Sequence, residues 1–170
     1  MKRPLPTEYS SHVEHYISLV KGDNVIKSLG DQILSMQELL AETPEDKEDF
    51  SYAPGKWTLK EVVGHMIDTE RVFAYRALCF GRGDNREIHR VDENLFVSFA
   101  NFNNRTLYDF SHEFSVIRES TIHLFKNFNE EARDRKGTAN NKPYTVRALM
   151  FLTAGHVAHH MNVIKERYLV

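Results

Sequence analysis

The stretch WTLKEVVGHMIDTERVFAYRALCFG, residues 57–81, decides the fold class because it carries both a helix start and a long helical pattern. Thr58 and Glu61 have the spacing of a capping box, in which each side chain bonds the backbone N–H of the other residue. Behind this cap, apolar residues recur at steps of three and four down to Phe80, which is the period of an amphipathic helix. Gly81 is well suited to end it. The stretch therefore predicts a helix over 59–81.

Three further segments show the same period, at about 23–42, 107–128 and 145–168. Few runs alternate with a period of two, so we predict an all-α protein built as a four-helix bundle. With no repeat or composition break, residues 1–170 form one domain, and 1–22 form an N-terminal extension whose residues 9–20 make a short helix across the body. The connection from Gly81 to Asn104 is far longer than the two to eight residues usual in bundles. A crossover of this length between the second and third helices suits a parallel pair, a lid over a site, or both.

Composition restricts the classes of protein that fit. The 170 residues carry a formal net charge of −2, with 41% hydrophobic and 27% charged residues, which excludes wholesale disorder. Without a basic block, no nucleic-acid partner is expected. The single cysteine, Cys79, excludes an intrachain disulfide and a cysteine-paired zinc finger. Neither a signal peptide nor an apolar run of about 20 residues is visible, so we expect a cytoplasmic protein with no membrane partner.

The nine histidines are the most informative feature. His156 and His160 are four residues apart and therefore share one face of a helix, the face that also carries its apolar stripe. Burying two imidazoles has a desolvation cost unless a partner such as a divalent metal satisfies their nitrogens. The alternative is a histidine-rich helix end exposed to solvent or to a subunit interface. His159 points about 100° away from His160, so we expect it to support the pair or to lie at an interface.

His65 is the candidate for a third ligand, from the flank of the 59–81 helix. Gly64 precedes it as Gly155 precedes His156, and a glycine inside a helix costs about 1 kcal/mol relative to alanine. Close packing of the second and fourth helices would explain both glycines and bring the histidines together; alternatively, both glycines are merely tolerated. The other five histidines are expected to be surface or packing residues: His12, His15, His89, His112 and His123.

Together these segments resemble the DinB-like, YfiT-related superfamily of four-helix-bundle metalloenzymes. The likeness rests on residues 54–71, 75–77 and 155–160, with 167–168 at the end of the last helix. The resemblance implies a metal site made of His65, His156 and His160, which are the three residues that the spacing selects. It also implies a homodimer, and it favours thiol transfer, since relatives include bacillithiol S-transferases and mycothiol-dependent isomerases.

Three neutral imidazoles leave a divalent ion with at least one open coordination position, which is typical of catalytic sites. Zinc is the first choice and nickel the second. Such an ion lowers the pKa of a bound water to about 7 or holds a substrate thiol as thiolate. We therefore expect a metal-dependent hydrolase or thiol S-transferase acting on a small molecule, with a low-molecular-weight thiol as cosubstrate in the second case. The alternatives are a non-catalytic metal- or ligand-binding bundle of a stress response, or a metal-free dimer interface packed by histidines.

A general base is harder to find. Val157 stands where zinc proteases of the HExxH type have their glutamate, so peptidase activity is not expected. The catalytic candidates are Glu70, on the inward face of its helix, and Asp92, with Glu93 beside it in the crossover as a further carboxylate able to orient a water. Arg118 is expected to form a surface ion pair. The favoured alternative for Glu70 is a structural ion pair with one of three arginines, namely Arg71, Arg76 or Arg147.

Overall fold

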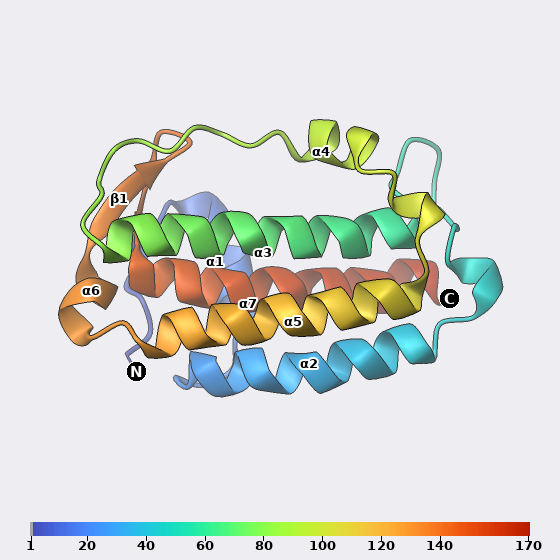
Figure 1. Cartoon of the computed structure of the whole chain (residues 1–170), viewed down its shortest axis with the longest axis horizontal. Coiled ribbons are helices and arrows are strands. Elements are labelled where there is room, and N and C mark those ends of the chain that lie inside the picture. Colours follow the sequence, from blue (N-terminus) through green and yellow to red (C-terminus); the bar gives the residue numbers. More distant parts are fainter. Residues whose placement is uncertain (1) are drawn as a thin grey trace.

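Four long helices form the body of the protein in the computed structural model, which describes residues 2–170 (Figure 1). Each begins behind a side chain that accepts a hydrogen bond from the backbone N–H three residues later, which satisfies one of the free donors of the first turn. The predicted four-helix bundle is confirmed. The helices are α2 (Val25–Ala41), α3 (Leu59–Gly81), α5 (Leu107–Lys126) and α7 (Val146–Val163), capped by Asn24, Thr58, Thr106 and Thr145.

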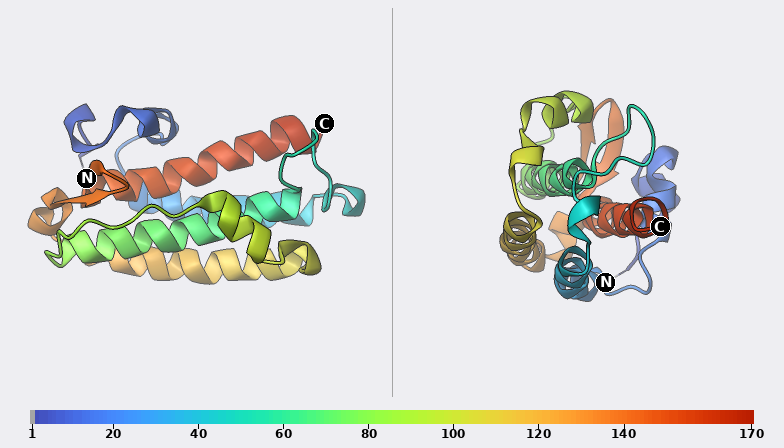
Figure 2. Two further views of the ribbon diagram at one scale, coloured as in Figure 1. Left: turned by 90° about the horizontal axis from the view of Figure 1, so that it is seen from above. Right: turned by 90° about the vertical axis from the view of Figure 1, so that its right-hand side faces the viewer.

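The long crossover makes two neighbouring helices parallel. Around the bundle, α3 packs against α5 and α7, and α2 packs against the same two helices from the other side. The chain returns along the outside of α3 before α5 begins, so α3 and α5 run in the same direction (Figures 1 and 2). This return carries α4 (Glu93–Phe99) and the short 3-10 turn η4 (Phe102–Asn104). The crossover thus produces the expected parallel pair, and it also lines the cavity described below.

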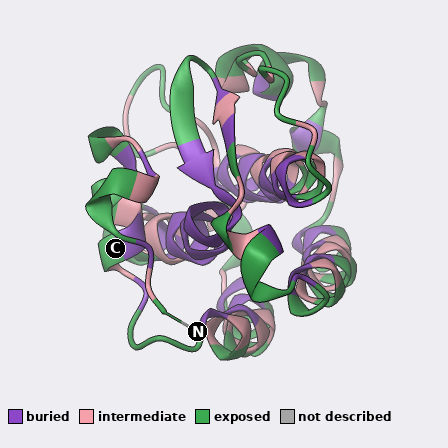
Figure 3. Ribbon diagram, turned by 90° about the vertical axis from the view of Figure 1, so that its left-hand side faces the viewer, coloured by how far each residue is buried: buried purple, intermediate pink, exposed green. Residues whose placement is uncertain are grey.

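Apolar side chains fill the space between the helices in two clusters. One surrounds Phe80, Phe125 and Phe151, and the other surrounds Met66, Phe110 and Phe114. The helix faces that point inward are buried and those that point outward are exposed, as Figure 3 shows. Within residues 2–170, no helix is long and apolar enough to cross a membrane.

A buried ion pair lies among these apolar residues. Arg118 is 0% and Glu70 2% exposed. Nε of Arg118 donates to both carboxylate oxygens at 2.9 and 3.0 Å, and Nη2 donates to Oε2 at 2.7 Å. Nη1 donates to the Leu29 carbonyl at 3.1 Å and to Gln32 Oε1 at 2.6 Å. Both residues thus form structural ion pairs, as expected, but two details of the predictions were wrong: Arg118 is buried, and the partner of Glu70 is none of the three arginines proposed for it.

The prediction of an all-α chain also missed a small sheet. After the short helix α6 (Glu130–Asp134), strands β1 (Lys136–Ala139) and β2 (Lys142–Thr145) form an antiparallel hairpin. Its turn residues, Asn140 and Asn141, have φ of 53° and 56°, a left-handed conformation that asparagine tolerates better than most residues. The hairpin closes one end of the bundle (Figure 1).

The N-terminal segment lies across the body, as predicted, but its helix is shorter. Two 3-10 turns, η1 (Pro6–Glu8) and η2 (Ser11–Val13), precede α1 (Glu14–Ser18), which packs on α7. At the other end, α7 continues into the π-helical turn η5 (Ile164–Tyr168), where the Tyr168 hydroxyl donates to the Trp57 carbonyl at 2.8 Å. This bond ties the end of the last helix to the residue before the α3 cap.

Candidate metal centre

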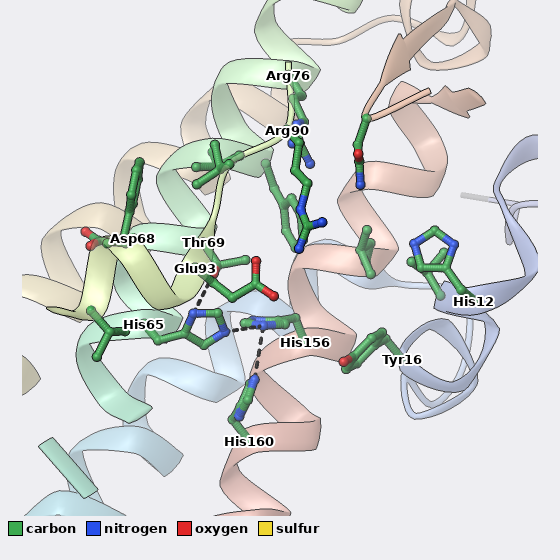
Figure 4. Close-up of a pocket in the computed structure, with 18 of the residues that line it drawn as sticks. His12, Tyr16, His65, Asp68, Thr69, Arg76, Arg90, Glu93, His156 and His160 are labelled. Atoms are coloured by element: carbon green, nitrogen blue, oxygen red, sulfur yellow. Dashed lines mark hydrogen bonds between the residues drawn. The ribbon is translucent and has the colours of Figure 1, made fainter. Parts of the chain in front are cut away.

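Three imidazoles meet between α3 and α7. His156 and His160 are one turn apart on α7, and His65 faces them from α3 (Figure 4). Nε2 of His156 lies 3.2 Å from Nε2 of His65 and 3.1 Å from Nε2 of His160. Their potential ligand atoms all lie within 4.8 Å of one another. The structure therefore brings together the three residues that the sequence singled out.

The geometry fits a metal better than a chain of hydrogen bonds. An imidazole nitrogen carries either one proton or one lone pair, so Nε2 of His156 cannot serve both neighbouring nitrogens fully. A zinc ion bound at about 2.0–2.1 Å from each nitrogen separates its ligand atoms by about 3.4 Å in a tetrahedral arrangement. The two observed Nε2 separations are close to this value. The donor set thus fits a divalent cation.

Burial keeps these imidazoles neutral near pH 7. Desolvation lowers the pKa of His65 to about 4, although the Glu93 carboxylate acts in the opposite direction. Desolvation, with the neighbouring histidines adding to it, lowers the pKa of His160 to about 3 and that of His156 well below 6.5. Only a neutral imidazole binds a metal, so all three are in the state required of a ligand.

Residues around the cluster hold His65 in place. Thr69, one turn along α3, has its hydroxyl 3.4 Å from Nδ1 of His65. The ring of Trp57 lies 4.7 Å from the His65 ring between centroids, tilted by 44°. On the other side of the cluster, the centroids of the Tyr16 and His156 rings lie 5.7 Å apart. The cluster is therefore walled by aromatic rings from two separate segments.

The two glycines allow close contacts, but not the one that the sequence suggested. A Cβ on Gly64 would lie 2.6 Å from the ring of Phe102 in η4. A Cβ on Gly155 would overlap the backbone carbonyl of Tyr16 in α1. The prediction that both glycines permit close packing of α3 on α7 was wrong. Each instead admits a segment that covers the bundle next to a histidine.

A cavity of about 460 Å³ opens in front of the cluster, between α3, α7, the crossover, the hairpin and the N-terminal segment (Figure 4). Its volume is in the range of small-molecule sites. Two carboxylates line it, Asp68 and Glu93. Asp68 accepts a hydrogen bond from Arg71 at 3.0 Å. Glu93 is half-buried and, within residues 2–170, its carboxylate is in no hydrogen bond or ion pair (Figure 4).

The other predicted site residues lie elsewhere. The carboxylate of Glu70 is turned toward Arg118, and Glu70 does not line the cavity. Asp92 is exposed and caps α4, accepting from the N–H groups of Asn94 and Leu95 at 3.0 and 3.2 Å. His159 is outside the cluster, with Nδ1 3.3 Å from Nε2 of His15. Of the two crossover carboxylates that the sequence singled out, Glu93 lines the cavity, whereas Asp92 caps a helix.

These features define a four-helix bundle with a partly buried three-histidine cluster, and comparison with known proteins places it in a family. Residues 34–164 match the sequence profile of the DinB superfamily, so the chain belongs to the DinB superfamily. A comparison with curated protein sequences found no match.

Among solved structures, the fold is similar to that of YfiT from Bacillus subtilis, described as a probable metal-dependent hydrolase with an unusual four-helix bundle topology. The TM-score is 0.75 at 14% sequence identity, and the match covers 97% of this chain and 90% of YfiT. At this identity the likeness establishes the shared fold.

Proposed function

We propose that this protein is a metal-dependent enzyme that holds one divalent ion through His65, His156 and His160 and acts on a small molecule. The observation that carries the proposal is the convergence of three Nε2 atoms at the wall of a 460 Å³ cavity. Zinc is the first choice and nickel the second, because all three donors are imidazoles.

Hydrolysis is the reaction that we favour. A divalent ion held by three neutral imidazoles supplies Lewis acidity and leaves at least one coordination position open. Glu93 reaches the same cavity from the crossover and has no competing partner within residues 2–170. In this proposal Glu93 takes a proton from the attacking water and later returns it to the leaving group. The description of YfiT as a probable metal-dependent hydrolase agrees with this proposal.

Thiol transfer is the second candidate, supported by the family resemblance. Cys79 does not line the cavity, so a reactive thiol would have to arrive on a low-molecular-weight cosubstrate. The same open coordination position would bind it as thiolate. A bundle that binds a metal or ligand without catalysis is the remaining alternative, and it predicts metal content without turnover.

Metal analysis of protein purified without a chelating tag tests the metal site. We expect about one divalent ion per chain, lost in His65→Ala and in His156→Ala. His159→Ala is the matched control on the same helix, because its ring pairs with His15 outside the cluster. Equal metal loss in His159→Ala would show that the ligand set is wrong.

Turnover is then measured on zinc- and nickel-loaded protein with esters and amides, and separately with thiols plus electrophiles. Hydrolysis that disappears in His156→Ala would support the favoured reaction, whereas turnover only with thiols would support transfer. A metal-loaded protein inactive on every substrate would favour the non-catalytic alternative. The homodimer and the cytoplasmic location stay predictions, and light scattering of the purified protein tests the first.

A further inference from the structure

We propose that the cavity binds substrates with an anionic group, a carboxylate or a phosphate, through Arg76 and Arg90. This inference rests on the proposed function for one point only: the part of the substrate that reacts is taken to lie at the metal centre of the three histidines. It names the chemical class of the substrate, which the histidine cluster by itself leaves open.

Arg76 is a partly buried cation without an anion. It projects from α3 into the cavity, and within residues 2–170 it forms no ion pair. Its Nε is fully buried and has no hydrogen-bond partner. Arg133 and Arg147 also have an unpartnered Nε, but their Nη atoms bind carboxylates. The guanidinium carbon of Arg76 instead lies 6.0 Å from the centroid of the Phe73 ring.

Such an arrangement has a cost that a ligand would remove. A buried guanidinium is destabilising unless an opposite charge and hydrogen bonds replace the lost water. Burial accordingly lowers the pKa of Arg76. Arg118 differs from Arg76 in this respect, because its N–H groups donate to Glu70, Leu29 and Gln32 within the bundle. A structural arginine of this protein therefore has its hydrogen-bond partners inside the fold.

A second cation and a hydroxyl lie along the same wall. Arg90 enters the cavity from the crossover and, within the described residues, has no carboxylate within ion-pair distance. The Tyr144 side chain, 5% exposed, brings its hydroxyl from β2 to 3.4 Å from Nε2 of His12. In Figure 4, Arg76 and Arg90 lie on the opposite side of Glu93 from His160. The cavity thus has guanidinium groups at one end and the histidines at the other.

The distance between these ends limits the shape of the substrate. Arg76 is eleven residues beyond His65 on α3, which corresponds to about 16 Å along the helix axis. The wall between them includes the apolar side chains of Val72, Phe73 and Leu152. The cavity therefore fits an elongated molecule with an anionic end and a reactive group at the metal centre. Guanidinium groups suit such an anionic end because they bind carboxylate or phosphate with two parallel hydrogen bonds.

The test is a titration of ¹⁵N-labelled full-length protein with acetate and, separately, inorganic phosphate at constant ionic strength, following the arginine Nε–H signals. We expect the Arg76 signal, assigned with Arg76→Met, to shift saturably. Arg90→Met should weaken the affinity at least about tenfold, as expected for a lost charged hydrogen bond. Arg86→Met is the matched control, because Arg86 lies in the same crossover but pairs with Asp84 outside the cavity.

Tighter binding of acetate would identify a carboxylate substrate, and tighter binding of phosphate a phosphorylated one. The proposal is overturned if neither anion shifts Arg76 saturably, or if Arg90→Met and Arg86→Met have the same affinity. Arg90 is exposed, so its substitution leaves folding intact even if Arg76→Met does not fold. The titration is run on metal-free and zinc-loaded protein, so its outcome is separate from the metal analysis that tests the proposed function.

Discussion

Replacing Arg118 by methionine removes the cation from the buried pair while keeping much of the side-chain volume. Glu70, which is only 2% exposed, would then lack a counter-charge. The Leu29 carbonyl and Gln32 would each lose a hydrogen-bond donor. Breaking a buried pair in this way costs about 3–5 kcal/mol. We therefore expect Arg118→Met to be among the most destabilising single changes in the chain.

The loss converts into a shift in melting temperature. A domain of 170 residues has an unfolding entropy of about 0.36 kcal/mol/K near 60 °C, so the expected decrease in Tm is about 8–14 °C. Circular dichroism at the helix band measures it. Arg71→Met is the control, since Arg71 is exposed and pairs with Asp68 and Glu113 near the surface. Exposed pairs are worth less than about 1 kcal/mol, which predicts a decrease below about 3 °C.

A double variant separates the buried charge from the lost packing. Glu70→Leu combined with Arg118→Met removes both charges, and it should recover much of the stability, as apolar replacements of buried pairs often do. The reasoning is refuted if Arg118→Met melts within about 3 °C of the parent, or if the double variant is no more stable than the single one. Activity retained in the double variant would further show that Glu70 belongs to the scaffold.

Three other outcomes follow from the structure. Metal-free protein should lose stability as pH falls from 6.5 toward 4, because unfolded His65 takes up a proton in this range while burial holds its folded pKa at about 4. His65 alone contributes about 2 kcal/mol to this loss at pH 5, and His156 and His160 add to it in the same direction. Urea unfolding measures the loss, and an unchanged pH dependence in His65→Phe would contradict the contribution of His65. Gly155→Ala should destabilise by about 1–3 kcal/mol and make the N-terminal segment sensitive to protease, because its Cβ overlaps the Tyr16 carbonyl. Gly30→Ala, with open space around its Cβ, should be neutral or stabilising, and equal effects would refute this argument. Glu93→Gln should lower kcat about 100-fold or more while metal content stays unchanged; an unaltered kcat would remove Glu93 from the mechanism.

The parts of the fold that sequence predicted are those fixed by local signals. The capping box of Thr58 and Glu61 is present with both bonds, at 3.2 and 2.8 Å. The histidine triad was also accessible, since the four-residue spacing on α7 and the family resemblance point to the same residues. The signal for the hairpin was weaker, because Asn140 and Asn141 mark a turn while the strands beside them are only four residues long.

The features that sequence did not predict depend on distant partners. Arg118 looks like any surface arginine until Glu70, 48 residues earlier, is placed opposite it. Gly64 and Gly155 were correctly marked as packing sites, but nothing local shows that Phe102 and Tyr16 are what they contact. The cavity has the same origin, since its walls come from five separate stretches of the chain. Local patterns cannot encode such pairings.

The separation of His65 and His156 by 91 residues also sets an order of events during biosynthesis. At about 5–20 residues per second, a ribosome adds the second histidine roughly 5–18 seconds after the first. Throughout that interval His65 is a single imidazole on an incomplete bundle, and no tridentate set exists. Tridentate binding of the ion that we propose therefore has to follow the docking of α7.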